Sequence, residues 1–370
     1  MSDRKLATVE TILDIQPIPD ADAIEVATVR GWTVVVKKDE FIVGQKCIFF
    51  EVDSWMPVEL APFLVKHKEP REYMGVKGER LRTAKLRGQL SQGLVLDPHK
   101  IMSHDQAHLL PIGTDMTERL NIQLYEKPVA ACLAGQVRGS FPSCIPKTDQ
   151  ERIQNIKNYF EKYPDLEFEI TEKLDGSSCT IYNKMNDPEV GVEHDFGVCS
   201  RNLDLKEDGN NSFWKVANKY KLKEILQYLN LNLAIQGELI GEGIQGNKYQ
   251  LKDQDLRVFD IYDIEKRRHL TSDERLEVLE KINNCTYGHE EAILLGYEEC
   301  HTLEHAPLLG TLKLKDFTFE SLLAFAEAPS VACKINTTRE GIVCKSKELV
   351  NGQTISFKVI SNKFLLKEKD

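Results

Sequence analysis

The chain has 370 residues and a formal net charge of −10, and 41% of its residues are hydrophobic and 29% charged. Its length predicts two domains rather than one core, and its composition is that of an ordinary globular protein. No apolar run reaches the roughly 18 residues of a membrane span, and the acidic balance argues against a general coat for nucleic acid.

Cysteine usage and the amino terminus point to a cytoplasmic or nuclear protein without a signal peptide. Nine cysteines are scattered from Cys47 to Cys344 without a CxxC pair, which is typical of reduced thiols. The first five residues lead directly into a strand-like alternation.

Positive charge gathers in two stretches, residues 66–87 and 334–369, each with eight Lys/Arg and three acids. Such local patches suit a partner whose phosphates are held in a defined place. Each patch alone is equally typical of a solvated surface.

The first hundred residues read as short strands separated by turns. The expected strands are residues 8–15, 24–29, 32–37, 46–52, 81–86 and 93–96. Their even spacing, with Gly or Pro between them, predicts a small β-barrel. The segment 135–148 is rich in Gly, Pro and Ser, so we place a domain boundary there, between residues 1–134 and 135–370.

The second domain mixes strands with helices. Helices are expected to begin at Thr148 and at Thr271, each with a capping box, and a further helix is expected to be capped by Ser212. The expected strands are residues 166–172, 177–182, 233–240, 257–264, 341–345 and 355–360. Because helices and strands do not alternate strictly, the fold class is α+β rather than doubly wound.

A Lys-x-Asp-Gly segment, Lys173 to Gly176, lies between two of these predicted strands. A deprotonated lysine at such a turn can attack the α-phosphate of a nucleotide and form a phosphoramidate, and a metal ion or nearby cations would lower its pKa. Gly176 would let the backbone turn or approach the nucleotide closely. A four-residue pattern alone is more typical of a β-turn with a surface lysine.

Further segments follow in order: Ser200–Asn202, Gln236–Ile240, Phe259–Ile261, Glu340–Val343 and Ser356–Lys358. Together with the lysine motif they resemble the covalent nucleotidyltransferases, the superfamily of polynucleotide ligases and RNA capping enzymes. Each segment alone could be an ordinary strand, with Phe259 in a core. Their joint order over about 190 residues is what favours the resemblance.

The resemblance implies a role for each motif residue. Arg201 would touch the sugar or the ligated end, and Glu238 the ribose hydroxyls. Phe259 would stack on the purine, Glu340 would organise a catalytic metal ion through water, and Lys358 would contact the α-phosphate.

The resemblance further implies that Lys173 carries AMP, with Glu172 beside the nucleotide. It implies that Asp175 and Glu238 join Glu340 in holding Mg²⁺ or Mn²⁺. Related ligases often show Lys-x-Lys in the last motif, whereas isoleucine stands at position 360 here; Lys363, at a longer spacing, is the candidate for the second lysine.

The segment Gly241–Gly246 fits GxGxxG and follows a predicted strand. A dinucleotide site needs a helix that opens at that loop. Polar residues without a helical apolar stripe follow, so we interpret the segment as a loop beside the ribose-binding glutamate.

The N-terminal domain decides between branches of the superfamily. DNA ligases and capping enzymes carry an OB-fold after the last motif, but only seven residues follow Lys363 here. Strings such as residues 31–37 and 86–93 resemble RNA ligases that place an OB module in front. That resemblance implies an ATP-dependent RNA ligase, which joins 3′-hydroxyl and 5′-phosphate ends through lysyl-AMP and RNA-adenylate.

The expected partner is RNA, as a nicked duplex, bound by a monomer. Cations of the OB-like module would hold the phosphates beside the break, and the candidates are Arg82, Lys85 and Arg87. A GTP-using capping enzyme, a DNA ligase and a non-catalytic RNA-binding protein remain as alternatives.

Overall fold

The computed structural model describes residues 4–65, 69–125, 135–186, 193–287, 301–333 and 337–367. Both basic stretches lie partly outside these ranges, at residues 66–68 and at residues 334–336, 368 and 369. The predicted domain boundary also lies partly outside them, because residue 134 is not described. Within them, no helix is both long and apolar enough to cross a membrane.

The chain divides into two compact units. The first comprises residues 1–128 and 154–157, with residue 370, and the second comprises residues 129–153 and 158–369. The short segment 154–157 therefore belongs to the first unit, although both of its flanks belong to the second.

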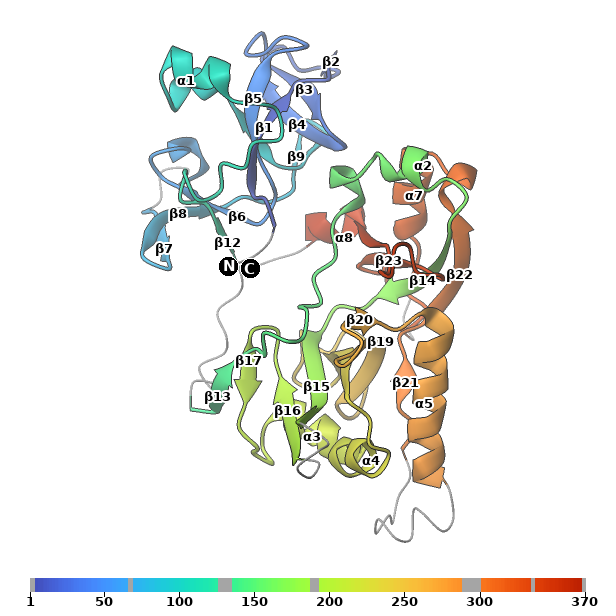
Figure 1. Ribbon diagram of the computed structural model, residues 1–370. Helices are drawn as coiled ribbons and strands as arrows, with labels where there is room; N and C mark the ends of the chain where they lie inside the picture. Colours follow the sequence, from blue (N-terminus) through green and yellow to red (C-terminus); the bar gives the residue numbers. More distant parts are fainter. Residues whose placement is uncertain are drawn as a thin grey trace. The chain divides into compact units, whose positions relative to one another are not determined.

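The regular structure of the first unit consists mainly of antiparallel strands (Figure 1). Its sheets are β1–β5–β11 (Ala7–Thr11, Lys46–Phe50, Leu94–Leu96), β2–β3–β4 (Asp14–Pro17, Ile24–Val29, Trp32–Lys37), β12–β6–β8–β7 (Gln123–Leu124, Ser54–Pro57, Val76–Arg80, Arg71–Tyr73) and β9–β10 (Ala84–Leu86, Gln89–Ser91). Its only described α-helix is α1 (His104–Leu109). The strands predicted at residues 24–29 and 32–37 are confirmed with those bounds.

Two hydrophobic cores flank strand β5. Ile48 and Phe50 belong to one cluster of buried side chains, and Cys47 and Phe49 belong to the other. Successive residues of a strand point to opposite faces, so β5 separates the two cores.

Two predicted strands of this unit prove to be interrupted. The expected strand 8–15 is split into β1 and β2, because the backbone of Ile12 pairs with the loop at Gln45 instead. The expected strand 81–86 spans a break between β8 and β9, where the backbone of Leu81 pairs with Ser54 and Asp53.

Residues 154–157 pack inside the first unit through Asn155. Its side chain accepts a hydrogen bond from Trp32 Nε1 (2.7 Å) and donates one to Glu51 Oε1 (2.6 Å). The backbone N–H of Gly31 donates to the carbonyl of Gln154 (3.1 Å). Because Trp32 and Glu51 are almost fully buried, these bonds satisfy polar groups that water does not reach.

The second unit contains two antiparallel sheets. The larger has the order β13–β17–β16–β15–β18–β19–β20 (Val137–Ser140, Leu203–Leu205, Glu193–Cys199, Ser177–Asn186, Leu233–Ile240, Asp255–Asp263, Arg268–His269), with β21 (Glu304–His305) parallel to β19. The smaller has the order β22–β14–β23–β24 (Leu308–Lys313, Glu167–Lys173, Gly341–Ser346, Ser356–Ile360).

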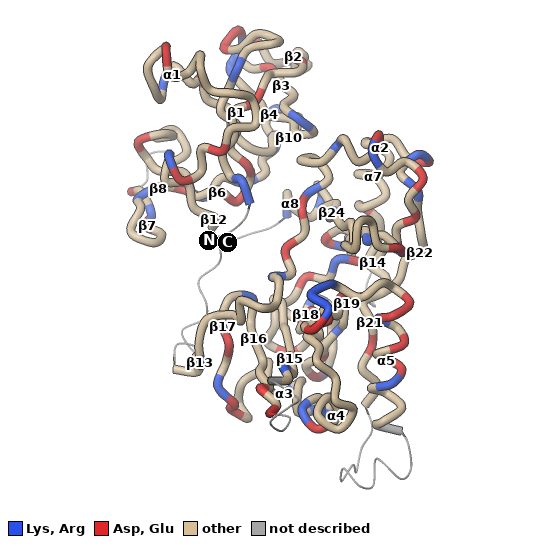
Figure 2. The backbone as a smooth tube through the Cα atoms, in the orientation of Figure 1, with Lys and Arg blue, Asp and Glu red and all other residues tan. Residues whose placement is uncertain are grey.

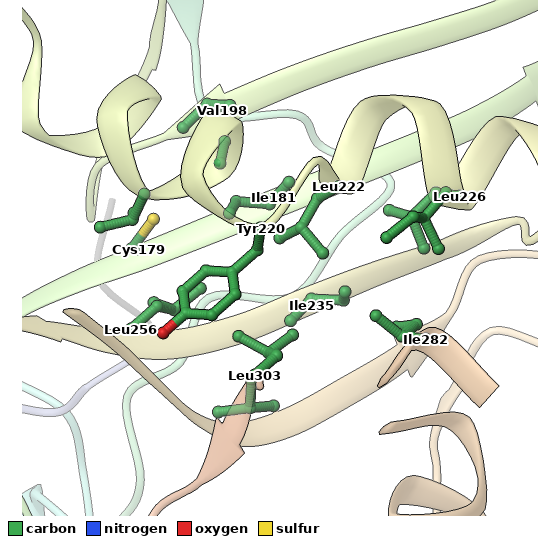
Figure 3. Close-up of a cluster of buried hydrophobic side chains, with 14 of the residues drawn as sticks. Cys179, Ile181, Val198, Tyr220, Leu222, Leu226, Ile235, Leu256, Ile282 and Leu303 are labelled. Carbon is green, nitrogen blue, oxygen red and sulfur yellow. The ribbon is translucent and has the colours of Figure 1, made fainter. Parts of the chain in front are cut away.

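Helices α3 (Ser212–Lys219), α4 (Leu222–Tyr228) and α5 (Ser272–Tyr287) pack on one face of the larger sheet. Figure 3 shows Leu222 and Leu226 of α4, with Tyr220 just after α3, over Ile181 and Ile235 of the sheet. This apolar layer fixes the strands, and the residues that alternate with it face the other way.

The predicted helix starts fare differently. Asn211 rather than Ser212 caps α3, and Thr271 caps α5 through the expected box with Glu274, whose carboxylate accepts from the Thr271 N–H (2.9 Å). The prediction of a helix at Thr148 is wrong: residues 148–151 have no regular secondary structure, and only short helices follow, Ile153–Asn155 and α2 (Tyr159–Lys162). The other described α-helices of this unit are α7 (Phe319–Ala326) and α8 (Asn362–Lys367).

Candidate active site

The candidate nucleophile lies where the chain passes from the smaller sheet to the larger one. Strand β14 ends at Lys173, and β15 begins at Ser177 after a turn of three residues. In register, Lys173 faces Gly341, which follows Glu340. Across the turn, Ser178 faces Glu238. The two sheets thus bring motif residues 65 to 167 positions apart to one junction.

The turn itself leaves no room for a side chain at Gly176. A Cβ there would lie 2.3 Å from the carbonyl oxygen of Leu239. The backbone N–H of Gly176 donates to Glu238 Oε1 (3.0 Å), and the preceding N–H, of Asp175, donates to the hydroxyl of Tyr249 (2.7 Å). Glycine is therefore required for close packing on β18, and two hydrogen bonds fix the turn.

Carboxylates surround the lysine. Lys173 Nζ lies 2.7 Å from Glu340 Oε1, and its side chain is about a quarter exposed (27%). Burial opposes the charged amine, but Glu340 and Glu238 outweigh it and raise the pKa of Lys173. Burial, together with the charge of Glu340, raises the pKa of Glu238 to about 7, although Lys173 acts in the opposite direction.

Asp175 forms an ion pair with Lys248, which belongs to the loop after β18. The Lys248 ammonium also lies 4.6 Å from the centre of the Phe364 ring. This loop includes the GxGxxG segment 241–246, and it forms bends and turns rather than opening a helix, as expected. Lys248 and the adjacent Tyr249 therefore hold the Asp175 side chain and its backbone.

Two of the cations predicted to bind the nucleotide or the ligated end share one carboxylate. Lys358 Nζ lies 2.6 Å from Asp149 Oδ1, and Arg201 Nη2 lies 3.2 Å from Asp149 Oδ2. Lys363 is not in this group: its ammonium pairs with Glu327 (3.2 Å) and its side chain is 65% exposed. The structure thus brings Lys358 and Arg201 together and leaves Lys363 apart.

The Glu172 side chain points to a neighbouring loop. Its carboxylate accepts a hydrogen bond from the Ser330 hydroxyl, and it also accepts from the Val331 N–H at 2.8 Å and the Ala332 N–H at 3.4 Å. Glu172 is almost fully buried. Glu172 directly precedes the nucleophile in the sequence, and its side chain anchors the loop that precedes β23.

Phe259 is half-buried beside the same turn. It packs against a cluster that includes Leu174 and Tyr249. Its carbonyl accepts a hydrogen bond from Lys345 Nζ (2.5 Å). The ring is thus close to the nucleophile turn, on the side of the larger sheet.

Sequence reasoning missed Asp149, Tyr249, Lys248 and Lys345. None of them belongs to a residue pattern that indicates a role, because each acts on a motif residue from a distant segment. Lys345 carries the one usable signal, since a lysine inside the apolar strand Gly341–Ser346 requires a buried partner.

The three cations predicted to hold RNA lie in the first unit. Arg82 precedes β9, and Lys85 and Arg87 lie on the β9–β10 hairpin; we call these three residues the basic hairpin. Arg87 and Gly88 both have positive φ values, 47° and 83°, as a two-residue type I′ turn requires. Lys85 and Arg87 are exposed. Figure 2 shows basic and acidic residues on both units over the part of the chain that the structure describes.

The predicted metal ligands are hard carboxylate oxygens, which Mg²⁺ and Mn²⁺ prefer. Over the ranges that the structure describes, no three His, Cys, Asp or Glu side chains are grouped closely enough to hold a metal ion by themselves. Mg²⁺ is usually bound by one or two carboxylates together with substrate phosphates, so Glu340 and Glu238 fit such a site.

Comparison with known proteins gives a consistent result. An RNA ligase family model matches residues 166–360, and an OB-fold domain model matches residues 6–98. A search of curated proteins found no match. These matches confirm the predicted fold class, an OB module followed by a ligase-type nucleotidyltransferase domain.

Solved structures of the Naegleria gruberi RNA ligase are similar over nearly the whole chain. One variant, solved apo, is 42% identical with a TM-score of 0.84, and covers 99% of this chain and 98% of that chain. Another, solved with ATP and Mn, is 41% identical with a TM-score of 0.83 and 98% coverage of both chains. A structure with PPi is 42% identical with a TM-score of 0.82, again with 98% coverage of both.

Proposed function

This chain belongs to the RNA ligase family, and we propose that it seals RNA ends with ATP through a covalent intermediate on Lys173. The observation that carries the proposal is the position of Lys173 between the two sheets, within 2.7 Å of Glu340 and beside Glu238. The related Naegleria gruberi ligase has been solved with ATP and Mn and with PPi, which supports the same co-substrate here.

The proposed reaction has three steps. The neutral Lys173 amine attacks the α-phosphorus of ATP, so a P–N bond forms, the nitrogen loses a proton, the bond to the β-phosphate breaks and pyrophosphate leaves. A 5′-phosphate oxygen of RNA then displaces the lysine, which takes up a proton, and a 5′–5′ pyrophosphate linkage forms. Finally a 3′-hydroxyl attacks the 5′-phosphorus, loses its proton and releases AMP.

The first step requires the neutral amine, whereas Glu340 and Glu238 raise the pKa of Lys173. Mg²⁺ or Mn²⁺ at these carboxylates, and in the proposal also at Asp175, would withdraw their negative charge from the lysine and stabilise charge on the phosphates. Lys358 would supply further positive charge at the α-phosphate, and Arg201 would touch the sugar or the ligated end, once each has left Asp149.

The remaining site residues select and hold the nucleotide. We propose that the Phe259 ring stacks on adenine and that Glu238 also binds the ribose hydroxyls. The Glu172 carboxylate is occupied by the loop at Ser330, so any contribution from this residue would come from its place next to the nucleophile. Lys363 would act only if it left Glu327.

The first unit would position the RNA. The proposed substrate is a nicked duplex, bound by one copy of the chain, with the basic hairpin on the phosphates beside the nick. We keep residues 1–134 and 135–370 as the proposed functional division, with segment 154–157 as an addition to the first part.

Labelled ATP and GTP, each incubated with the protein and divalent metal, test the first step. ATP should label the protein, and Lys173→Ala should abolish the label but still seal pre-adenylylated RNA. Labelling by GTP would favour a capping enzyme. Sealing of DNA in preference to RNA would favour a DNA ligase, and no label with either nucleotide would favour a non-catalytic RNA-binding protein.

A further inference from the structure

Strand β19 contains a β-bulge at Phe259. Its pairing with β18 changes register there: Gln236 faces Asp260, but the next residue, Gly237, faces Val258. Phe259 is therefore the extra residue. Burial agrees, because Val258 and Ile261, which strict alternation would put on opposite faces, both join the core under the helices. A bulge of this kind turns a side chain to a new direction.

A bulged residue loses its ladder partner, so its backbone polar groups need another one. The Phe259 carbonyl finds it in Lys345 Nζ, at 2.5 Å. The same ammonium lies 2.6 Å from Asp260 Oδ2 and 5.5 Å from the centre of the Phe259 ring. Lys345 comes from β23 of the smaller sheet, so one side chain joins the two sheets at the bulge.

This lysine is almost completely buried, with 4% of its surface exposed, and Asp260 has 3%. Asp260 also pairs with His269 Nδ1 at 3.3 Å. Burial lowers the pKa of Lys345, and burial alone would raise the pKa of Asp260, but Lys345 and His269 lower it overall. A buried ion pair stabilises a fold less than well-packed apolar side chains of similar volume do. We therefore infer that the Lys345–Asp260 pair serves to position a neighbouring group.

We propose that Lys345 is a positioning residue for the nucleotide: it fixes the bulge that presents the Phe259 ring to the purine. The inference rests on the proposed function, since it takes the ring to be the adenine platform. The ring packs against the cluster that contains Leu174, the residue that follows the nucleophile. An error in the bulge would therefore misplace the base, and with it the α-phosphate that Lys173 attacks.

The test removes the lysine without leaving a buried charge. Lys345→Met alone strands the Asp260 carboxylate and is expected to lower the melting temperature. The double variant Lys345→Met/Asp260→Asn is neutral and of similar volume, so it should melt nearer to the wild type. It still lacks the ammonium that Phe259 requires.

The readout is single-turnover formation of lysyl-AMP over a range of ATP concentrations. The double variant should raise the ATP concentration for half-saturation about tenfold, the order of a lost stacking contact, and change the saturating rate less than about threefold. A general structural role of Lys345 would instead reduce the fraction of active protein and leave the ATP concentration for half-saturation unchanged. The matched control is Tyr182→Phe/Asp204→Asn, which removes another buried polar pair of the same unit and should leave half-saturation unchanged.

A double-mutant cycle with Phe259→Ala distinguishes a failure of the positioning role of Lys345 from a failure of the purine role of Phe259. Phe259→Ala should raise half-saturation as much as the double variant, and the triple variant no further, because both changes act through one ring. If Phe259→Ala raises it and the double variant does not, the inference is overturned while the purine platform stands. If Phe259→Ala has no effect, the purine role fails and the inference fails with it.

A second variant covers the case in which the double variant does not fold. Gly237 lies opposite the bulge, and a Cβ there would come within 2.8 Å of the Arg257 carbonyl oxygen. Gly237→Ala thus disturbs the bulge without touching the buried pair. It should give the same rise in half-saturation, and wild-type half-saturation in a folded Gly237→Ala protein would overturn the proposal.

Discussion

The substitution Gly176→Ala should slow adenylylation far more than it destabilises the fold. Gly176 has no positive φ, so the change is a matter of space and not of backbone strain. The new Cβ would lie 2.3 Å from the Leu239 carbonyl oxygen, 2.9 Å from Ile240 Cγ2 and 3.0 Å from Glu238 Cγ, whereas ordinary contact begins at 3.4 Å. The turn must therefore retreat from β18 by about 1 Å, a shift large enough to cost roughly 100-fold in rate when it displaces an attacking atom.

The same shift would stretch the 3.0 Å hydrogen bond from Gly176 to Glu238 beyond its useful range. We expect Gly176→Ala to destabilise the fold by about 1–3 kcal/mol, and to slow single-turnover formation of lysyl-AMP by about two orders of magnitude at saturating ATP. Gly139→Ala is the matched control, since nothing lies within 4 Å of its Cβ. Adenylylation within twofold of the wild type in Gly176→Ala would refute the reasoning.

Three further predictions concern charge. Lys358→Ala should slow adenylylation about 10²–10³-fold, whereas Lys363→Ala, whose ammonium pairs with Glu327, should stay within about threefold of the wild type in the same labelling assay; equal losses would place both lysines at the phosphate. Replacing all three cations of the basic hairpin by alanine should reduce the slope of log affinity against log salt for nicked RNA by about 2–3, and an unchanged slope would make the hairpin ordinary surface. A hydrogen bond from Arg268 lowers the pKa of Glu274 from 4.5 to about 2. Its carboxylate therefore stabilises the fold above pH 4.5 and loses this effect as the pH falls through about 2. Glu274→Gln should cost roughly 0.5–1 kcal/mol at pH 7 and nothing below pH 2 in thermal melts, and a constant difference would contradict this assignment.

The motif order was predictable from sequence because most motif residues lie in, or directly beside, strands of strong apolar pattern. Strands β3, β4 and β18 have the predicted bounds. The junction of Lys173 with Glu340 and Glu238 follows once those strands pair. What the resemblance implied about Lys173, Glu238 and Glu340 is thus geometrically consistent, and their roles stay predictions.

The helix expected at Thr148 shows where local signals fail. The capping box with Glu151 is present in the sequence, yet the N–H of Lys358 donates to the Glu151 carbonyl (2.8 Å), and Arg152 pairs with Lys358 as an isolated bridge. The Thr148 hydroxyl bonds to Ser178 instead of capping. Tertiary pairing with β24 supplied the backbone partners that a helix would otherwise provide.

The partners of the motif residues were out of reach for a different reason. Asp149 holds Lys358 and Arg201 from a loop, and Tyr249 reaches the turn at Asp175 from 74 positions away. A single sequence does not show which residues from distant segments come into contact in the fold. The bulge at Phe259 is also hidden, because a single extra residue leaves the composition of a strand unchanged.

Segment 154–157 bears on how the protein can be dissected. A fragment that ends near residue 128 would keep Trp32 and Glu51 but lose Asn155, the partner of both. The complementary fragment would carry Asn155 into solvent. The two units therefore cannot be separated by a single cut in the chain. A chimera that joins the first unit to another ligase domain must also carry a segment equivalent to residues 154–157. When the two fragments are mixed, the missing hydrogen bonds should form again only if this segment can bind to the first unit.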